Sequence, residues 1–273
     1  MKLFYRIVWV ALALALTVGS VQTLIHQHWA VPLVLRAEAF EGQKVESSGL
    51  VVAEAHDHAH DHHHEVSTTA APWVPEDGLE RTFWTWVANV LHVFALALFV
   101  QVALAVWTLR HGVATSWWSL GLGMALAGWL SLHLWPALGL HAEIPGMDAA
   151  RLGSRQGWWL LAVSGAGAAC ALLAFARGAW RWLAAVVLLA VPFAVGAPQI
   201  AADPLAGFGP DARQVLLVLG EQFVVVTHLI AVSLWLMLGL AGSAVFVQWV
   251  RPLILHTGAA PIGVAATTTA TGV

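Results

Sequence analysis

A tract of alternating histidines and acids at residues 56–65 has the composition best suited to a chemical role. Its ten residues contain six imidazoles and three carboxylates. Neutral imidazole is a common ligand for borderline divalent ions, and carboxylates neutralise part of the ion's charge. The tract therefore predicts weak, exchangeable sites for Co(II), Ni(II) or Zn(II). The ligands that we expect are His56, Asp57, His58, His60, Asp61, His62, His63 and His64.

The composition places this tract in a membrane protein. The 273 residues are 59% hydrophobic and only 10% charged, with a mean hydropathy of +0.76. Such a chain is too apolar for a soluble domain and predicts an all-α integral membrane protein surrounded by the lipid bilayer. It carries only two lysines and no basic surface for nucleic acid. The single cysteine, Cys170, excludes a disulfide within the chain and a multi-thiolate metal site.

Six apolar stretches are long enough, or nearly so, to span the hydrocarbon core as helices. They predict a polytopic bundle of about six transmembrane helices at residues 3–25, 82–109, 116–138, 157–176, 180–198 and 215–249. We expect the fifth helix to be broken or kinked, because Pro192, Gly196 and Pro198 interrupt it. The sixth exceeds the membrane thickness, so we expect it to protrude or tilt.

These stretches divide the chain into four parts. We expect the first helix and its outer end at 1–35, a polar loop rich in His and Asp at 36–81, a bundle of five helices at 82–250, and a disordered tail at 251–273. The first stretch also fits a cleaved signal peptide, because Lys2 and Arg6 precede an apolar run that ends in small residues. A retained anchor is favoured, since the apolar run is long and the helix can continue towards Pro32.

The distribution of charge predicts the orientation. Short connections that contain no acid hold Lys2, Arg6, Arg110, Arg177, Arg181 and Arg251. The fifteen acidic residues lie on the other side or, for Glu221, near its entrance to the last helix. The positive-inside rule then predicts that both termini are cytoplasmic and that the histidine loop faces outward.

Further histidines lie at the outer helix ends or inside the helices. Ionisable residues in a membrane usually face a protein interior or a water-filled cavity, so they are functional candidates. We expect an ion to pass from the loop by ligand exchange through His26, His28 and His141, then His133, Glu221, His228 and His92. His92, about 15 Å into its helix, forms with Thr85 and Asn89 a polar stripe typical of a pore-lining face. The alternative for each buried histidine is an interhelical hydrogen bond.

Several catalytic and energy-coupling motifs are absent from the sequence. It contains no P-loop, no His-Glu-x-x-His helix and no Gly-x-Ser-x-Gly elbow. Four methionines and one cysteine are too few soft ligands for a Cu(I) pathway. We therefore expect a metal transporter, with no enzymatic activity and no cofactor. Two alternatives remain open: a non-transporting scaffold or sensor that binds metal, and an intramembrane enzyme with a His-bound metal.

Several stretches spread over nearly the whole chain except the tail also carry a family resemblance. They are PLVLRAEAFE at 32–41, the histidine loop, PEDGLERT at 75–82, ANV at 88–90, HLWPALGL at 133–140, EIPGM at 143–147, RQGWW at 155–159 and GAP at 196–198. In order and spacing they resemble the CbtA family of bacterial cobalt transporter subunits.

The resemblance implies an inner-membrane protein of five or six helices that imports cobalt for cobalamin. It also implies a small single-helix membrane partner with its own histidines, CbtB. On this chain the family's motifs point to further site candidates without assigned roles: Glu38, Glu41, Glu76, Asp77, Glu80, Arg81, His133, Glu143 and Arg155.

Overall fold

The computed structural model describes residues 1–44, 75–200 and 202–256, so the histidine tract at 56–65 lies outside the described residues. Every regular element in these ranges is helical. The elements in chain order are α1 (Lys2–Ile25), η1 (His26–Ala30), α2 (Val31–Glu41), α3 (Leu79–His111), α4 (Trp117–Trp129), η2 (Leu130–Leu134), α5 (Trp135–Ala137), α6 (Leu152–Phe175), α7 (Trp180–Val195), α8 (Pro210–Val245), η3 (Phe246–Val250) and α9 (Arg251–His256).

Four continuous helices are long and apolar enough to cross a membrane, so the all-α membrane class is supported but the count of six is not confirmed. They are Lys2–Glu41, Leu79–His111, Leu152–Phe175 and Pro210–His256. Trp180–Val195 is apolar but shorter, and its length of about 24 Å falls below the roughly 30 Å of a hydrocarbon core. The α4–η2–α5 stretch has a lower mean hydropathy, because it contains tryptophans, serines and a histidine.

Several expected boundaries differ from the structure, and three of them lie near a proline. The first helix continues to Glu41, well beyond the predicted end at residue 25, because the π turn η1 allows it to pass Pro32. The tail predicted to be disordered from residue 251 begins with the helix α9. Helix α7 continues through Pro192 and ends at Val195, where Gly196 takes a φ of +87°.

The π-helical turns η1, η2 and η3 share one sequence feature. Each ends two residues before a proline, namely Pro32, Pro136 and Pro252. A proline within a helix lacks an N–H donor and its ring collides with the carbonyl four residues earlier. The wider π turn accommodates this collision without ending the helix. Two of the three turns carry candidate histidines, since His26 and His28 lie in η1 and His133 lies in η2.

Small residues allow the closest helix contacts. A Cβ on Gly19 of α1 would lie 2.9 Å from the Cα of Val90 in α3. A Cβ on Gly239 of α8 would lie 2.5 Å from the carbonyl oxygen of Gly121 in α4. Because lipid is as apolar as the side chains, helices in a membrane associate through this kind of close packing.

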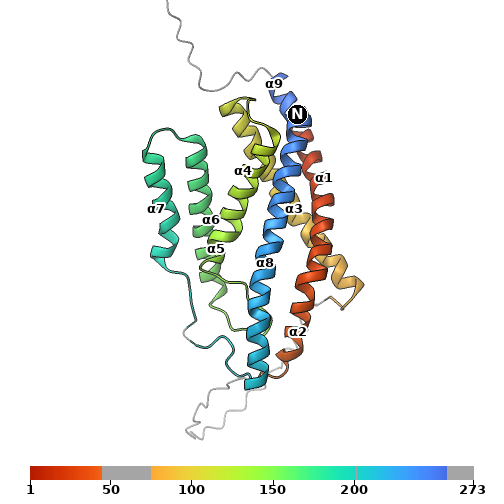
Figure 1. Cartoon of the computed structure of the whole chain (residues 1–273). Helices are drawn as coiled ribbons and strands as arrows, with labels where there is room; N and C mark the ends of the chain where they lie inside the picture. The colour runs from red at the N-terminus through yellow and green to blue at the C-terminus, as the bar shows by residue number, and fades with distance from the viewer. Residues whose placement is uncertain (45–74, 201, 257–273) are drawn as a thin grey trace, which may run out of the picture.

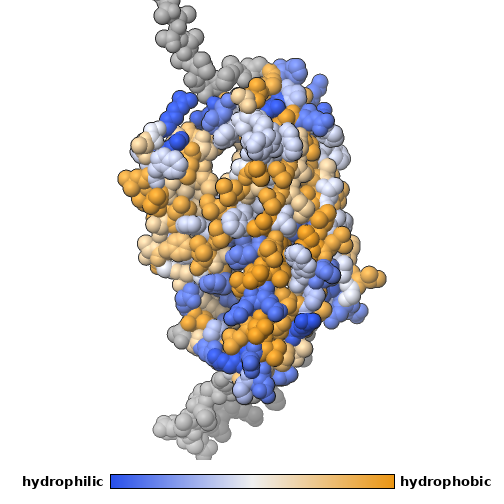
Figure 2. Space-filling view, viewed as in Figure 1, coloured by the Kyte–Doolittle hydropathy of each residue, from blue (hydrophilic) through white to orange (hydrophobic). Residues whose placement is uncertain are grey.

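The ends of the bundle differ in charge (Figure 1). The N-terminus, α9 and the α3–α4 and α6–α7 connections lie at one end, here called the basic end, with Lys2, Arg110, Arg177 and Arg251. The end of α2 and the connections at 138–151 and 196–209 lie at the other, here called the acidic end. In Figure 2 the hydrophobic colour dominates the middle of the visible face and hydrophilic residues gather towards both ends.

Replacing Gly239 by alanine should destabilise the α4–α8 contact by about 1–3 kcal/mol, because the new methyl group meets backbone of α4. The matched control is Gly123→Ala on α4, where nothing lies within 4 Å of the added Cβ. The control should gain up to about 1 kcal/mol from the better helix propensity of alanine. Unfolding of the purified proteins in detergent measures both, and equal shifts in the two variants would contradict the packing argument.

Candidate functional site

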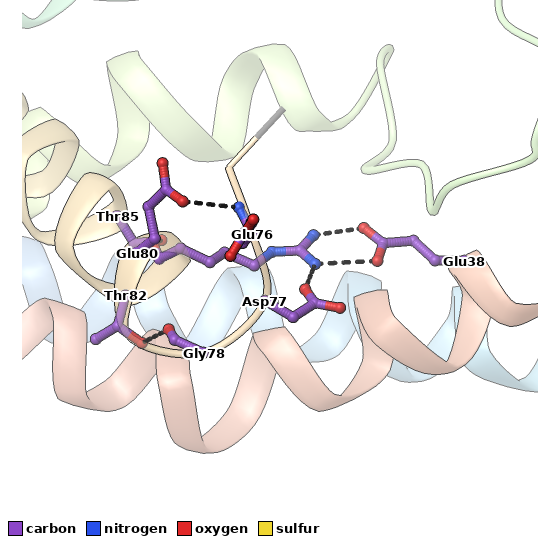
Figure 3. Close-up of polar contacts among 8 residues, drawn as sticks. Glu38, Glu76, Asp77, Gly78, Glu80, Thr82 and Thr85 are labelled. Atoms are coloured by element: carbon purple, nitrogen blue, oxygen red, sulfur yellow. Dashed lines mark hydrogen bonds and ion pairs between the residues drawn. The ribbon is translucent and has the colours of Figure 1, made fainter. Parts of the chain in front are cut away.

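Ion pairs hold the acidic end together. Arg81 of α3 binds both carboxylate oxygens of Glu38 in α2 at 3.1 and 2.5 Å, and also the carboxylate of Asp77 at 2.7 Å (Figure 3). Lys44 pairs with Asp148 at 2.6 Å, and Arg155 of α6 pairs with Glu143 at 2.8 Å. These residues link the end of α2 to the start of α3 and to the connection between α5 and α6.

Six of the candidates implied by the family's motifs are therefore engaged in structural contacts through their side chains: Glu38, Asp77, Glu80, Arg81, Glu143 and Arg155. Arg81 forms a bidentate ion pair with Glu38 and a second ion pair with Asp77, which is more exposed. Glu80 accepts a hydrogen bond from the backbone N–H of Glu76 at 3.2 Å. We assign these groups to the architecture of the acidic end, because an Arg-bound carboxylate has fewer oxygen lone pairs left for a metal.

A small apolar core lies beneath these ion pairs. Ile144 and Leu205, from the two long connections, pack with Leu33 of α2 and with Leu216 and Leu219 of α8. The connections also bond to each other, since the N–H of Asp148 donates to the carbonyl of Pro204 at 2.8 Å. The acidic end is thus a folded cap whose polar groups have fixed positions.

Asp203 shows how charge is stabilised in this cap. Hydrogen bonds from the Arg213 guanidinium and from the backbone N–H of Leu205 lower the pKa of the Asp203 carboxyl below its usual value. The carboxylate is therefore ionised at any pH near neutrality. Its contribution to stability is present above the unfolded pKa and is lost only in strong acid, as the pH falls through the lowered folded pKa.

Histidine 141 lies in this cap, next to a cleft of about 170 Å³. The cleft is lined also by Glu143, Asp148, Met147 and Gln199. One imidazole and two carboxylates therefore face the same small space, although Arg155 and Lys44 neutralise the carboxylates. The sequence selected His141, and the family resemblance added Glu143 and Arg155, but neither predicted the ion pairs, because these join residues that are distant in sequence.

His28 and Glu221 line a second, open groove between η1, α2 and α8. Both side chains are exposed on the protein surface. The remaining lining is mostly apolar and includes Trp29, Leu33 and Val225. The structure thus brings together an imidazole and a carboxylate that are almost two hundred positions apart in the sequence.

His26 and His92 form a further pair, from η1 and α3. They lie close enough for their charges to interact. Two residues of the predicted polar stripe on α3 make hydrogen bonds of their own. The Asn89 amide donates to the Thr23 hydroxyl of α1 at 3.1 Å, and the Thr85 hydroxyl donates to the Arg81 carbonyl of its own helix at 2.8 Å. His92 is exposed on the surface of the single chain. Two members of the predicted stripe therefore serve helix packing or local bonding.

His133 of η2 and His228 of α8 make the closest contact among the candidate histidines. Their ring centroids are 4.9 Å apart and their planes meet at 81°. The Nδ1 atom of His228 lies 2.8 Å from the carbonyl oxygen of Val224. The Nε2 atom of His133 is buried and has no hydrogen-bond partner among the described residues.

The candidates thus meet in pairs. Within the described ranges, no group of three or more His, Cys, Asp or Glu side chains is placed to hold a metal ion. Sequence reasoning also missed several buried amides, such as Gln22 of α1, whose Nε2 donates to the Ser233 hydroxyl at 3.1 Å. The side-chain nitrogen of Gln27 in η1 is buried with no partner in the described chain. The sequence signal that could have identified them was a single glutamine within an otherwise apolar helix.

These features define a multi-pass helical membrane protein with one pair of contacting imidazoles inside its bundle and a charged, folded cap at one end. The family model described as probable cobalt transporter subunit (CbtA) matches residues 4–247, and the chain belongs to this family. Its class is thus a transporter subunit, in agreement with the resemblance found in the sequence. Searches of curated proteins and of solved structures give no match.

The structural role of the Glu38–Arg81 pair is testable by stability. Glu38→Gln should lower the free energy of unfolding by about 1–2 kcal/mol, because it removes a bidentate, partly buried charge pair. Asp77→Asn is the matched control and should cost about 0.5 kcal/mol or less, since its side chain is 74% exposed. Unfolding in metal-free buffer separates the two, and an unchanged stability of Glu38→Gln would argue against the structural assignment.

Proposed function

We propose that this chain is the membrane subunit of an importer for a divalent transition metal, with cobalt as its physiological substrate. Membership of the probable cobalt transporter family supports the substrate. The observation that carries the proposal is the contact between the His133 and His228 rings from different spans. In addition, His28 and Glu221 line one groove, and His26 and His92 interact electrostatically. Such groups are costly in lipid and are retained where an ion pathway needs them.

The proposed route starts at the acidic end. Carboxylates outnumber arginines and lysines at this end of the described chain, so a negative excess remains after ion pairing and raises the local concentration of cations. From Glu221 the next ligand on the same helix, His228, lies seven residues further, a step of about 10 Å towards the middle of the bundle. An ion held by one pair passes to the next by exchange of ligands. Pairs suit passage better than clusters do, because an ion bound by many ligands leaves slowly.

In this proposal, the histidine tract at 56–65 captures the ion before it enters. Its candidate ligands follow α2, at the acidic end, so captured ions are delivered beside the cap. Basic residues are equally numerous at the two ends, but at the basic end they lie in short connections without acids, and we place this end in the cytoplasm by the positive-inside rule. Both termini are then cytoplasmic, and the protein resides in the bacterial inner membrane.

The word subunit in the family's description implies a partner chain. We propose that the partner is a small, single-helix membrane protein with histidines, resembling CbtB. A partner of this kind extends the supply of imidazoles without a soluble domain. It also explains how His92, exposed on the single chain, avoids contact with lipid.

Cobalt accumulation in cells tests the route. Replacing His92 and His133 together by glutamine should reduce uptake at least tenfold, because two successive pairs each lose an imidazole. The matched control is His256→Gln, an exposed histidine in α9 at the basic end, which should leave uptake within about twofold. Accumulation of cobalt, nickel and zinc is compared in cells with and without the gene.

Normal uptake by the double variant would remove the intramembrane route. Cobalt that binds to the protein in membranes without entering closed vesicles, with or without the partner, would instead identify a scaffold or sensor that does not transport.

Acidification should weaken cobalt binding, because a metal needs the neutral imidazole. We expect the histidines of the tract at 56–65 to have the ordinary imidazole pKa of about 6.5, so the neutral fraction of each falls roughly tenfold between pH 7.5 and pH 5.5. Binding of cobalt at this tract should therefore weaken by at least that factor over this interval. Carboxylates remain ionised throughout it, so a tract that bound the ion through acids alone would show a nearly flat response, and a flat response would contradict histidine ligation at the tract.

A further inference from the structure

The contact between His133 and His228 places two imidazoles face to edge inside the bundle. His133 belongs to the π turn η2, and His228 to α8, on different spans of the chain. The ring centroids are 4.9 Å apart and the ring planes meet at 81°, so the two imidazoles occupy one small region of the bundle.

The hydrogen bonding of His228 determines which of its nitrogens is available. Its Nδ1 atom lies 2.8 Å from the Val224 carbonyl, and a carbonyl only accepts hydrogen bonds. Nδ1 therefore carries the proton, and in the neutral ring Nε2 keeps its lone pair. A backbone carbonyl that fixes the tautomer of a histidine in this way is the usual support of a metal-binding imidazole.

The imidazole of His133 lacks a hydrogen-bond partner among the described residues at its Nε2 atom. Nε2 of His133 is buried and makes no hydrogen bond to the described chain, His228 included. The indole nitrogen of Trp129, one turn earlier on the same helix, is buried and unpartnered too. Buried polar atoms without partners are costly and are expected to face a guest or water. An interhelical hydrogen bond between the two histidines, the plain structural explanation, is not made.

We propose that His133 and His228 form a two-imidazole site that binds one borderline divalent ion through their Nε2 atoms, with water as the remaining ligands. Metal–nitrogen bonds of about 2 Å at a tetrahedral angle place the two nitrogens about 3.3 Å apart, a separation that small rotations of edge-on rings reach. The inference rests on the proposed transport function, because it names the transit site within that route and the class of ion that the site accepts.

The chemistry of the pair selects the ion. Imidazole nitrogen suits cobalt, nickel and zinc, whereas magnesium and calcium require oxygen ligands. No carboxylate completes a three-residue group here within the described chain. With two protein ligands the ion is held weakly and exchanges readily, as a transit site requires. The π turn before Pro136 gives His133 a position that a regular helix would shift around the axis.

The test is cobalt binding to the purified full chain in detergent, with His56, His58, His60, His62, His63 and His64 replaced by asparagine to remove the loop sites. Visible absorption of Co(II) reports nitrogen ligation directly. We expect His133→Gln and His228→Gln each to abolish the same one equivalent of bound cobalt, and the double variant to lose nothing more, because both residues hold a single ion. Zinc should displace this cobalt, and a large excess of magnesium should not.

His256→Gln in the same background is the control and should retain the equivalent. Thermal unfolding of each variant in metal-free buffer verifies that the bundle is intact. Retention of the full cobalt spectrum in the double variant would overturn the site, and additive losses from the two single variants would show two independent histidines in place of a shared ion.

Binding and transport can fail separately. If the purified chain binds cobalt at this pair but cells with the gene accumulate no cobalt, the site stands and the transport proposal fails. If cells take up cobalt while cobalt binding to the purified chain is unchanged by His133→Gln and His228→Gln, the transport proposal stands and the site is wrong.

Discussion

Polar atoms inside the bundle must find partners within the protein, because hydrocarbon supplies neither donors nor acceptors. Most of them do so in simple ways. The Asn89 amide donates to Thr23, the Gln101 amide to the Gly242 carbonyl, and the Gln22 amide to Ser233. Several hydroxyls bond to a carbonyl of their own helix, as Thr108 does to Leu104. A few buried atoms of the described chain depart from this pattern: the Nε2 of His133, the indole nitrogen of Trp129, and side-chain atoms of Gln22, Gln27, Gln101 and Arg181. Among them, His133 is the one whose imidazole contacts a second imidazole.

The same constraint explains why the charges gather in a cap. An ion pair at the water interface retains part of its hydration, whereas one in hydrocarbon would pay the full cost of desolvation. The carboxylates of the cap are fixed by arginine and lysine and by a small apolar core beneath them. In the proposed route, this rigid polar end is where ions enter, and the imidazoles inside the bundle are the next ligands.

The sequence predicted the class of fold, the segregation of charge and the family, because composition and motif spacing carry those properties directly. It did not predict the helix boundaries at Glu41 and His256, because the apolar stretches end before the helices do, whereas the π turns before Pro32 and Pro252 allow each helix to continue. It selected His133 and His228 but not their contact, because the pairing depends on how α4 packs against α8 through Gly121 and Gly239. The roles of the residues at 56–65 remain predictions, since these residues lie outside the described chain.

The glycines that bring α4 to α8 also set the geometry of the imidazole pair. A side chain at Gly239 would push the two helices apart, and η2 continues directly from α4 towards His133. The separation of the two rings is therefore controlled by backbone contact elsewhere in the interface and not by the histidines themselves. A pair positioned in this way can adjust to an ion by small ring rotations while the helices keep their spacing. The packing and the proposed transit site are thus two consequences of one helix interface.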